Sequence, residues 1–219
     1  MRYEILKRGF DVVFSMFGII LVLSWLTPIV ALIIILDSRG SVFFIQSRDG
    51  KDGKPFRCYK FRTMKPNIMA NVLQAQPNDE RITRIGNFLR ASHIDELPQF
   101  YNILIGDMSF VGPRPHMHRD TEHYAKLIPD YYTRLQVLPG FTGLAQVKNL
   151  KGATSHLQQM RGRVKMDNFY VSRLSPGLDF LILVSTVRIF LTESLNLPLS
   201  GSESELVVSA DADKITKAA

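Results

Sequence analysis

Two adjacent carboxylates, Asp95 and Glu96, lie in a stretch of the chain that is rich in arginine. Arg90 precedes them, and Arg114 follows between two prolines that fix the backbone on both sides. Guanidinium groups bind phosphate in bidentate fashion, and an ionised carboxylate can attack phosphorus or bind Mg²⁺. The pattern therefore indicates phosphate chemistry, although an Asp–Glu pair before a helix is usually a cap with a favourable first-turn charge.

The residues after the carboxylate pair have helical spacing. Asp95 is expected to be the N-cap, which puts Glu96 at the first helical position and Pro98 in the first turn. Both carboxylates would then lie at a helix N-terminus, where the dipole keeps them ionised and free N–H groups can hold phosphate. The apolar positions that predict the helix are Leu97, Phe100, Tyr101 and Leu104.

Shorter elements are expected to position these groups. Residues 42–45 and 56–61 predict a β-hairpin, because they flank a glycine- and proline-containing turn. Lys60 lies near the end of its second strand, and Arg62 follows. A short helix is expected around Phe88, directly before the carboxylates. Further on, 109–111 predicts a short strand leading to the Pro-Arg-Pro sequence, and the glycines of 138–143 predict a close backbone approach.

The run from Val12 to Leu36 contains no charged residue and is long enough to cross a bilayer as a helix. We expect a kink or break at Pro28, with the hydroxyls of Ser24 and Thr27 bonding the freed carbonyls. Basic residues flank both ends of the run, which favours the cytoplasmic side for both. A helix that enters the membrane, breaks and returns to the same face satisfies this pattern better than a straight span.

Taken together, these segments resemble the bacterial sugar transferases, that is, the monotopic polyprenyl-phosphate phosphoglycosyl transferases. The resemblance covers nearly the whole chain up to about Leu197, and several motifs in the same order are far more specific than any one of them. They are Lys7–Arg8 before the apolar run, FFIQSRDGKDGKPFRCYKFRTM (43–64), IDELPQ (94–99), GDMSFVGPRP (106–115), LPGFTGLAQV (138–147) and MDNFYVSRLSPGLDFLILVSTV (166–187).

The resemblance implies a mixed, helix-rich α/β fold. Residues 1–38 would form a re-entrant membrane helix-break-helix. Residues 39–197 would form a small cytoplasmic catalytic domain with a short β-hairpin and interfacial helices. The apolar stretch 178–191, too short to span, would be a core or interfacial helix, and 198–219 is expected to be a polar, disordered tail. The extra N-terminal membrane domain of larger relatives is not expected.

The resemblance also implies a reaction at the bacterial inner (cytoplasmic) membrane, on its cytoplasmic face. A UDP-sugar would donate sugar-1-phosphate to a polyprenyl (undecaprenyl) phosphate, UMP would leave, and assembly of an exopolysaccharide or other surface glycan would begin. Asp95 would be the nucleophile that carries a covalent phosphosugar. Asp95 and Glu96 would bind Mg²⁺, and Lys60, Arg90 and Arg114 would bind substrate phosphates. The sugar and the length of the lipid chain stay open.

Composition limits the alternatives. The chain has 219 residues and a net charge of +7, which favours an anionic partner such as acidic headgroups or a phosphorylated substrate. No nucleic-acid motif is visible, so nucleic acid is not expected as a partner. Cys58 is the single cysteine, which excludes a disulfide within the chain.

Two other functions use the same features. One is a membrane-bound magnesium-dependent phosphohydrolase, in which water replaces the lipid acceptor. The other is a basic membrane scaffold without catalysis. A zinc site at His116 and His118 is not expected, because no cysteine or acidic spacing completes it. A homo-oligomer is compatible with the sequence but not indicated by it.

Overall fold

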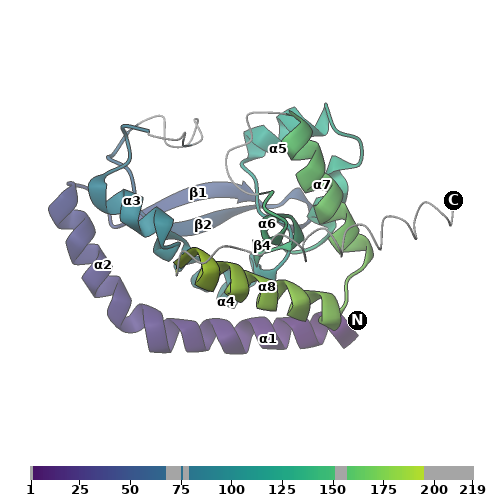
Figure 1. Ribbon diagram of the computed structural model, residues 1–219, viewed down its shortest axis with the longest axis horizontal. Helices are drawn as coiled ribbons and strands as arrows, with labels where there is room; N and C mark the ends of the chain where they lie inside the picture. Colours follow the sequence, from purple (N-terminus) through teal and green to yellow (C-terminus); the bar gives the residue numbers. More distant parts are fainter. Residues whose placement is uncertain (1, 68–74, 76–78, 151–156, 195–219) are drawn as a thin grey trace, which may run out of the picture.

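The computed structural model describes residues 2–67, 75, 79–150 and 157–194, and the predicted tail at 198–219 lies outside them (Figure 1). The chain is mixed and helix-rich, as predicted, with two small two-stranded sheets. Its α-helices are α1 (Arg2–Gly18), α2 (Ser24–Asp37), α3 (Arg84–Ala91), α4 (Gln99–Ile105), α5 (His118–Ala125), α6 (Leu144–Val147), α7 (Leu157–Ser172) and α8 (Pro176–Ser194). The strands are β1 (Phe43–Asp49), β2 (Pro55–Phe61), β3 (Ser109–Val111) and β4 (Gly140–Thr142). A π-helical turn η1 (Ile19–Leu23) and 3₁₀ turns η2 (Lys51–Gly53), η3 (Ile94–Glu96) and η4 (Tyr131–Gln136) complete the fold.

The apolar run forms one continuous helical stretch, so the expected kink or break near Pro28 takes the form of a bend without a break. Pro28 lies inside α2, which continues to Asp37. The irregular turn is η1, one turn earlier, where the wider π-helical backbone takes up the distortion that the proline ring imposes on the preceding turn. The Ser24 hydroxyl bonds the Ile20 carbonyl at 2.5 Å. The Thr27 hydroxyl has no hydrogen-bond partner among the described residues.

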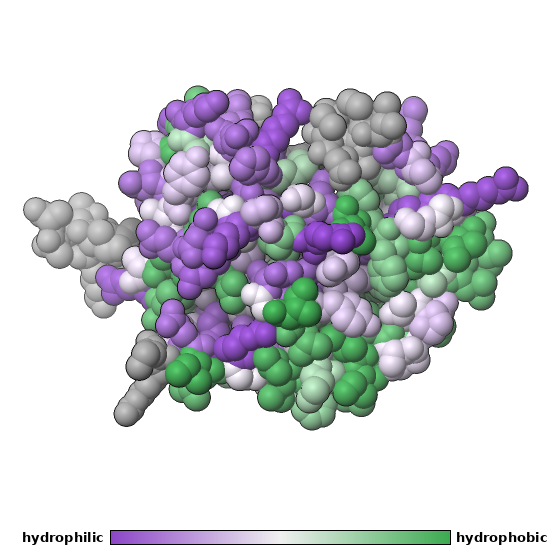
Figure 2. All heavy atoms as spheres, turned by 180° about the vertical axis from the view of Figure 1, so that it is seen from behind, coloured by the Kyte–Doolittle hydropathy of each residue, from purple (hydrophilic) through white to green (hydrophobic). Residues whose placement is uncertain are grey.

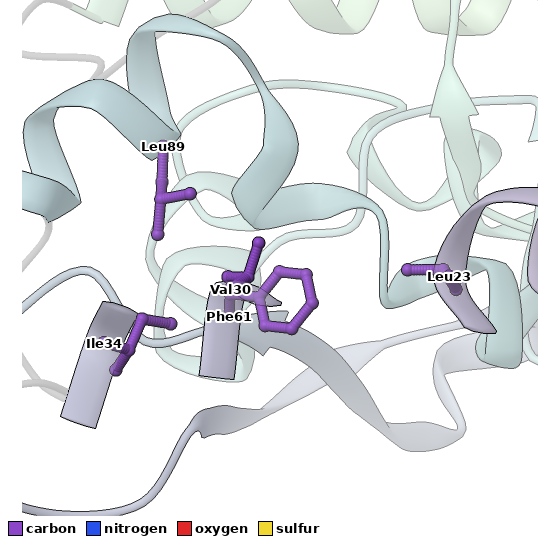
Figure 3. Packing of buried hydrophobic residues seen from close by; sticks show 5 residues of the cluster. All are labelled: Leu23, Val30, Ile34, Phe61 and Leu89. Carbon is purple, nitrogen blue, oxygen red and sulfur yellow. The ribbon is translucent and has the colours of Figure 1, made fainter. Parts of the chain in front are cut away.

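Both halves of this helix pack against the same body. Figure 1 shows α1 along the base of the molecule and α2 turning upward at its end. α1 packs on α4, so closely that a Cβ at Gly18 would lie 2.3 Å from the Phe100 ring. α2 packs on the hairpin and α3, where Ile34, Phe61 and Leu89 point toward one another (Figure 3).

Polar contacts fix α1 on the domain. The Arg8 guanidinium donates to the Ile103 carbonyl at 2.6 Å and to the Leu104 carbonyl at 2.8 Å, and so caps the C-terminal end of α4. The Lys7 ammonium lies 2.5 Å from the Asp179 carboxylate at the start of α8. These bonds tie the apolar helix to two elements far along the chain.

The outer face of the apolar helix is exposed. Tyr3–Asp37 is the one stretch, among the described residues, that is long and apolar enough to cross a membrane. Hydrophobic side chains gather over α1 and α2 on the lower and right-hand side of Figure 2. An exposed apolar surface of this extent is typical of a membrane-associated protein. The exposed side chains include Phe14, Phe17, Leu21, Trp25, Leu32 and Leu36.

The predicted hairpin is present, but its first strand, β1, runs to Asp49, four residues beyond the predicted end. β1 and β2 pair antiparallel from Phe43↔Phe61 to Asp49↔Pro55. Asn102 of α4 is fully buried and bonds the edge of β2, accepting from the Tyr59 amide at 3.0 Å and donating to the Arg57 carbonyl at 2.7 Å. The hairpin and the helix after the carboxylates therefore form one unit.

The predicted strand before the Pro-Arg-Pro sequence is β3, which pairs parallel with β4. The expected close backbone approach is confirmed, because a Cβ at Gly140 would lie 2.1 Å from the Gly112 nitrogen. After Pro129 the chain forms the 3₁₀ helix η4. The apolar stretch 178–191 lies within α8, where Ile182 is fully buried and side chains on the opposite face are exposed.

Candidate active site

The carboxylate pair lies in the 3₁₀ turn η3, so the prediction of Asp95 as an N-cap is wrong. The turn is preceded by His93 in the left-handed region, with φ 56°, and α4 begins only at Gln99 after Pro98. Asp95 already has helical backbone, whereas an N-cap residue has extended backbone. Its side chain therefore does not cap the helix, and it is buried, with 8% of its surface exposed.

Glu96 is held by two cations from different parts of the chain. The Lys60 ammonium lies 2.6 Å from Oε1 of Glu96. Arg114 Nη2 lies 2.5 Å from the same oxygen, and Nη1 donates to Oε2 at 3.2 Å. The fold thus brings the end of β2, the turn η3 and the Pro-Arg-Pro loop to one place. The Arg114 side chain keeps 32% of its surface exposed, so a substrate can reach it.

These contacts set the charge of Glu96. Burial alone raises the pKa of a carboxyl group, but the charges and hydrogen bonds of Arg114 and Lys60 outweigh burial and hold the pKa of Glu96 well below its usual range. The pKa of Arg114 is raised, chiefly by the charge of Glu96. Glu96 and Arg114 are therefore both charged at neutral pH.

Asp95 has a different environment from its neighbour. Burial raises the pKa of Asp95, and the Glu96 charge raises it further, while Lys60, Arg90 and Arg114 oppose the shift. Two adjacent carboxyl groups with pKa values shifted in opposite directions are suited to different roles. Glu96 is a fixed anion that orients cations, whereas Asp95 is a desolvated carboxylate with cations nearby, as a nucleophile toward phosphorus requires.

The other predicted cations differ in their positions. Arg90 lies on α3 and donates from Nε to the Thr63 hydroxyl at 2.8 Å, so it faces the segment after β2. Arg62 is buried and bonds the carbonyls of Ser38 and Arg39. Arg62 therefore fastens β2 to the end of α2 and does not contact the carboxylates.

Residues singled out around the site have structural partners. His116 is buried, with Nδ1 2.6 Å from the Tyr131 hydroxyl, and burial lowers its pKa well below the usual value. His118 lies 3.1 Å from Asp49. Asp107 follows Gly106, which ends α4 in the left-handed conformation. Sequence reasoning missed Arg134. Its guanidinium donates to the backbone carbonyl of Arg114, 20 positions earlier, and no motif in the sequence indicates this contact.

The residues present fit Mg²⁺ only together with a substrate. The part of the chain that the structure describes holds no group of three His, Cys, Asp or Glu side chains that could together bind a metal ion. Both Glu96 oxygens are engaged by Lys60 and Arg114. The Asp95 carboxylate is the oxygen donor for which we find no hydrogen bond within the described residues. Mg²⁺ commonly binds one or two carboxylates plus substrate phosphates and water, and this donor set suits that arrangement.

Comparisons with known proteins identify the family of the chain. A model of the bacterial sugar transferase family matches residues 2–193. The chain belongs to the bacterial sugar transferase family.

Three relatives have similar levels of sequence identity to this chain. The chain is 45% identical over 187 residues to the UDP-glucose:undecaprenyl-phosphate glucose-1-phosphate transferase of Escherichia coli (strain K12), covering 84% of this chain and 40% of that protein. It is 44% identical over 188 residues to the exopolysaccharide production protein PSS of Rhizobium leguminosarum bv. phaseoli, covering 84% of this chain and 94% of that protein. It is 41% identical over 191 residues to the UDP-N-acetylgalactosamine-undecaprenyl-phosphate N-acetylgalactosaminephosphotransferase of Aeromonas hydrophila, covering 87% and 44%. The chain thus spans less than half of the first and third of these relatives.

Proposed function

We propose that this protein transfers sugar-1-phosphate from a UDP-sugar to a polyprenyl phosphate and releases UMP. The observation that carries the proposal is the buried Asp95 carboxylate beside a Glu96 that is paired with Lys60 and Arg114. Such a site combines a nucleophile with cations placed to receive a diphosphate. The names of the relatives, which include glucose-1-phosphate and N-acetylgalactosamine phosphate transferases acting on undecaprenyl phosphate, support the same class of reaction.

The chemistry divides into two displacements. In the first, an Asp95 oxygen bonds to the β-phosphorus of the UDP-sugar, and the bond from that phosphorus to the bridging oxygen breaks. UMP leaves with the bonding electron pair, and the sugar phosphate stays on Asp95. In the second, a phosphate oxygen of the polyprenyl phosphate attacks the same phosphorus and Asp95 leaves as a free carboxylate. Covalent catalysis of this kind lets two substrates that mix poorly react in sequence.

The neighbouring residues have separate tasks in this scheme. Arg114 receives a substrate phosphate through its accessible side and stays oriented by Glu96, while Lys60 adds a point charge. Arg90 adds positive charge near Asp95. Asp95, with Glu96 beside it, would hold Mg²⁺ through carboxylate oxygens. When bound, Mg²⁺ offsets the charge of the diphosphate and polarises its oxygens.

The apolar helix places this chemistry at the membrane. We infer a re-entrant arrangement in the cytoplasmic membrane, with the catalytic domain, residues 39–197, on the cytoplasmic face. Both halves of the helix pack on one body: Arg8 bonds α4, and Ile34 packs against Leu89 of α3. A straight span would carry the far end of the helix, and the elements packed on it, to the other side of the membrane. The bent helix instead keeps the active site near the lipid phosphates.

The assay that tests this proposal is UMP release from a panel of UDP-sugars with Mg²⁺ and undecaprenyl phosphate. We expect at least one sugar to give UMP in a reaction that requires the lipid, and Asp95→Asn to abolish it while remaining folded. UMP release that is independent of the lipid would instead identify a phosphohydrolase. A fully active Asp95→Asn protein would exclude Asp95 as the nucleophile.

A further inference from the structure

The backbone of the Pro-Arg-Pro loop is held at four successive carbonyl groups. The Pro113 carbonyl accepts from the Gly140 amide at 2.9 Å, and the His116 carbonyl accepts from the Asp49 amide at 3.0 Å. Between them, the Arg114 carbonyl accepts from Arg134 Nη2 at 2.6 Å. The fourth, Pro115, accepts from Arg48 Nη1 at 3.1 Å. The two central bonds come from side chains, and one of them is made to Arg114, the residue that meets Glu96.

Arg134 is the better fixed of these two side chains. It is 1% exposed in the turn η4, and its partner Asp167 on α7 is also 1% exposed. Arg134 Nε donates to Asp167 Oδ2 at 3.0 Å, and Nη2 lies 2.9 Å from the same oxygen. One guanidinium thus joins a carboxylate on α7 to the backbone of the active-site loop. The planar fork of arginine allows both contacts at once, which the point charge of lysine does not.

A buried guanidinium behind Arg114 has an electrostatic cost. Arg48, Arg134 and Arg163 all lie near enough to His116 to lower its pKa, and Arg114 does the same. Like charges in this interior repel one another and oppose the approach of a further cation. Asp167 offsets this repulsion, because its carboxylate is paired with Arg134. Each charge of the pair balances the other, and removing one partner alone would leave a buried charge unpaired.

We propose that Arg134, held by Asp167, is a positioning residue that sets the direction of the Arg114 guanidinium through the Arg114 carbonyl. This inference rests on the proposed function. Arg134 contacts no carboxylate of the site and acts through the loop alone. Prolines on both sides of Arg114 restrict its backbone, so a displacement of its carbonyl is passed to its side chain. A misplacement of about 1 Å at such a group can reduce a rate by about 100-fold.

The test removes the Arg134 donor without leaving a buried charge unpaired. In the double variant Arg134→Met with Asp167→Leu, both partners become apolar residues of similar size. Arg134→Lys is a second variant, which keeps the charge next to Asp167 but loses the fork. Met160→Ala is the matched control, because Met160 is buried in the adjoining core with Tyr131 and its side chain has no charge or hydrogen-bond donor to place on the loop. Each change is also made in an Arg114→Ala background.

Two readouts are measured for every variant: kcat/KM for UMP release, and the Kd of UDP in detergent. In the native background we expect the double variant and Arg134→Lys each to lower kcat/KM by about 10- to 100-fold, with a weaker UDP Kd. In the Arg114→Ala background they should add less than about twofold, since the group that Arg134 positions is gone. Met160→Ala should lower the unfolding temperature while leaving kcat/KM of the folded protein unchanged.

Equal losses in the two backgrounds would overturn the proposal, as would an unchanged kcat/KM and UDP Kd in both Arg134 variants. If the double variant does not fold, Arg134→Lys in the two backgrounds decides between these results. The proposed function is judged separately by the wild-type protein. A wild type that binds UDP but releases no UMP would refute that function, and the coupling of Arg134 to Arg114 would still be read from the UDP Kd.

Discussion

The guanidinium of Arg114 holds both oxygens of the Glu96 carboxylate, with 2.5 Å from Nη2 to Oε1 and 3.2 Å from Nη1 to Oε2. Lys60 occupies the remaining approach to Oε1 at 2.6 Å. Glu96 thus acts as the fixed point against which two cations are aimed, and the adjacent Asp95 is left for chemistry. This arrangement requires the planar shape of the Arg114 guanidinium in addition to its charge.

Replacing Arg114 by lysine keeps the charge and removes the fork. We expect Arg114→Lys to lower kcat/KM for UMP release by about 100-fold, because one ammonium cannot bond Glu96 and a phosphate in bidentate fashion together. Arg119→Lys on the exposed face of α5 is the matched control and should be fully active. An Arg114→Lys enzyme within twofold of the wild type would mean that only the charge of Arg114 matters.

Asp95→Asn should stabilise the protein at neutral pH while abolishing transfer. Burial raises the pKa of Asp95, so the folded protein binds this proton more tightly than the unfolded chain does. The stability that this group contributes is present at low pH and is lost as pH rises through its raised pKa. Removing the charge abolishes that loss, and each 1 kcal/mol gained would raise the unfolding temperature by about 2–4 °C.

Thermal unfolding of Asp95→Asn and wild type at pH 4 and pH 8 measures this effect. The gain should be larger at pH 8 than at pH 4, where more of the wild-type Asp95 is already protonated. Asp52→Asn is the control, since Asp52 is exposed in the hairpin turn at a positive φ that asparagine tolerates. A lower unfolding temperature for Asp95→Asn at pH 8 would contradict the assignment of a desolvated carboxylate.

Glu96 should have the opposite pH dependence. Its pKa is held well below the usual value in the folded protein. Its ion pairs therefore contribute stability above the unfolded pKa of about 4.3, and this contribution is lost as pH falls through the lowered folded pKa. Glu96→Gln should destabilise the protein at pH 7 by about 3–5 kcal/mol, because it leaves two cations without their partner. Chemical denaturation at pH 7 measures this loss, and an unchanged midpoint would refute it.

Arg8 should matter for stability more than for chemistry. Its two bonds to the carbonyls at the end of α4 fasten the apolar helix to the catalytic domain. We expect Arg8→Ala to cost about 1.5–3 kcal/mol in unfolding free energy, the usual contribution of hydrogen bonds to a charged group. Arg39→Ala, exposed after α2, is the control and should be neutral. Equal effects of the two substitutions in detergent-solubilised protein would show that capping of α4 contributes nothing.

The re-entrant arrangement predicts that both ends of the apolar helix lie on one face. Glu4→Cys and Ser41→Cys place single exposed thiols near the two ends, and the native Cys58 is buried. In inverted inner-membrane vesicles, a membrane-impermeant maleimide should label both variants, and in intact spheroplasts neither. Labelling of one variant in each preparation would identify a spanning helix, and the unsubstituted protein reports any reaction of Cys58.

The sequence allowed prediction of those features that depend on local chemistry. The hairpin, α3, β3 and the glycine contact at Gly140 follow from alternation, helical spacing and turn residues. The resemblance to the bacterial sugar transferases, which rests on several motifs in the same order, predicts that Lys60, Glu96 and Arg114 belong to one site.

Other features depend on tertiary context. Whether Pro28 breaks the helix depends on which turn takes up the distortion that proline imposes. In this structure that turn is η1, which lies before Pro28. The sequence predicts Asp95 as a cap because no residue in it signals the left-handed backbone of His93, which starts the helical backbone earlier. The bond from Arg134 to the Arg114 carbonyl joins segments that only the fold brings together.

The covalent step on Asp95 is the central claim, and intact-protein mass spectrometry tests it most directly. The protein is mixed with the active UDP-sugar and Mg²⁺ but without polyprenyl phosphate. We expect one UMP per protein molecule in a rapid burst, together with a mass increase of one sugar phosphate that maps to Asp95 and disappears when the lipid is added. An enzyme that turns over with lipid, yet forms no adduct or carries it on another residue, would contradict the mechanism.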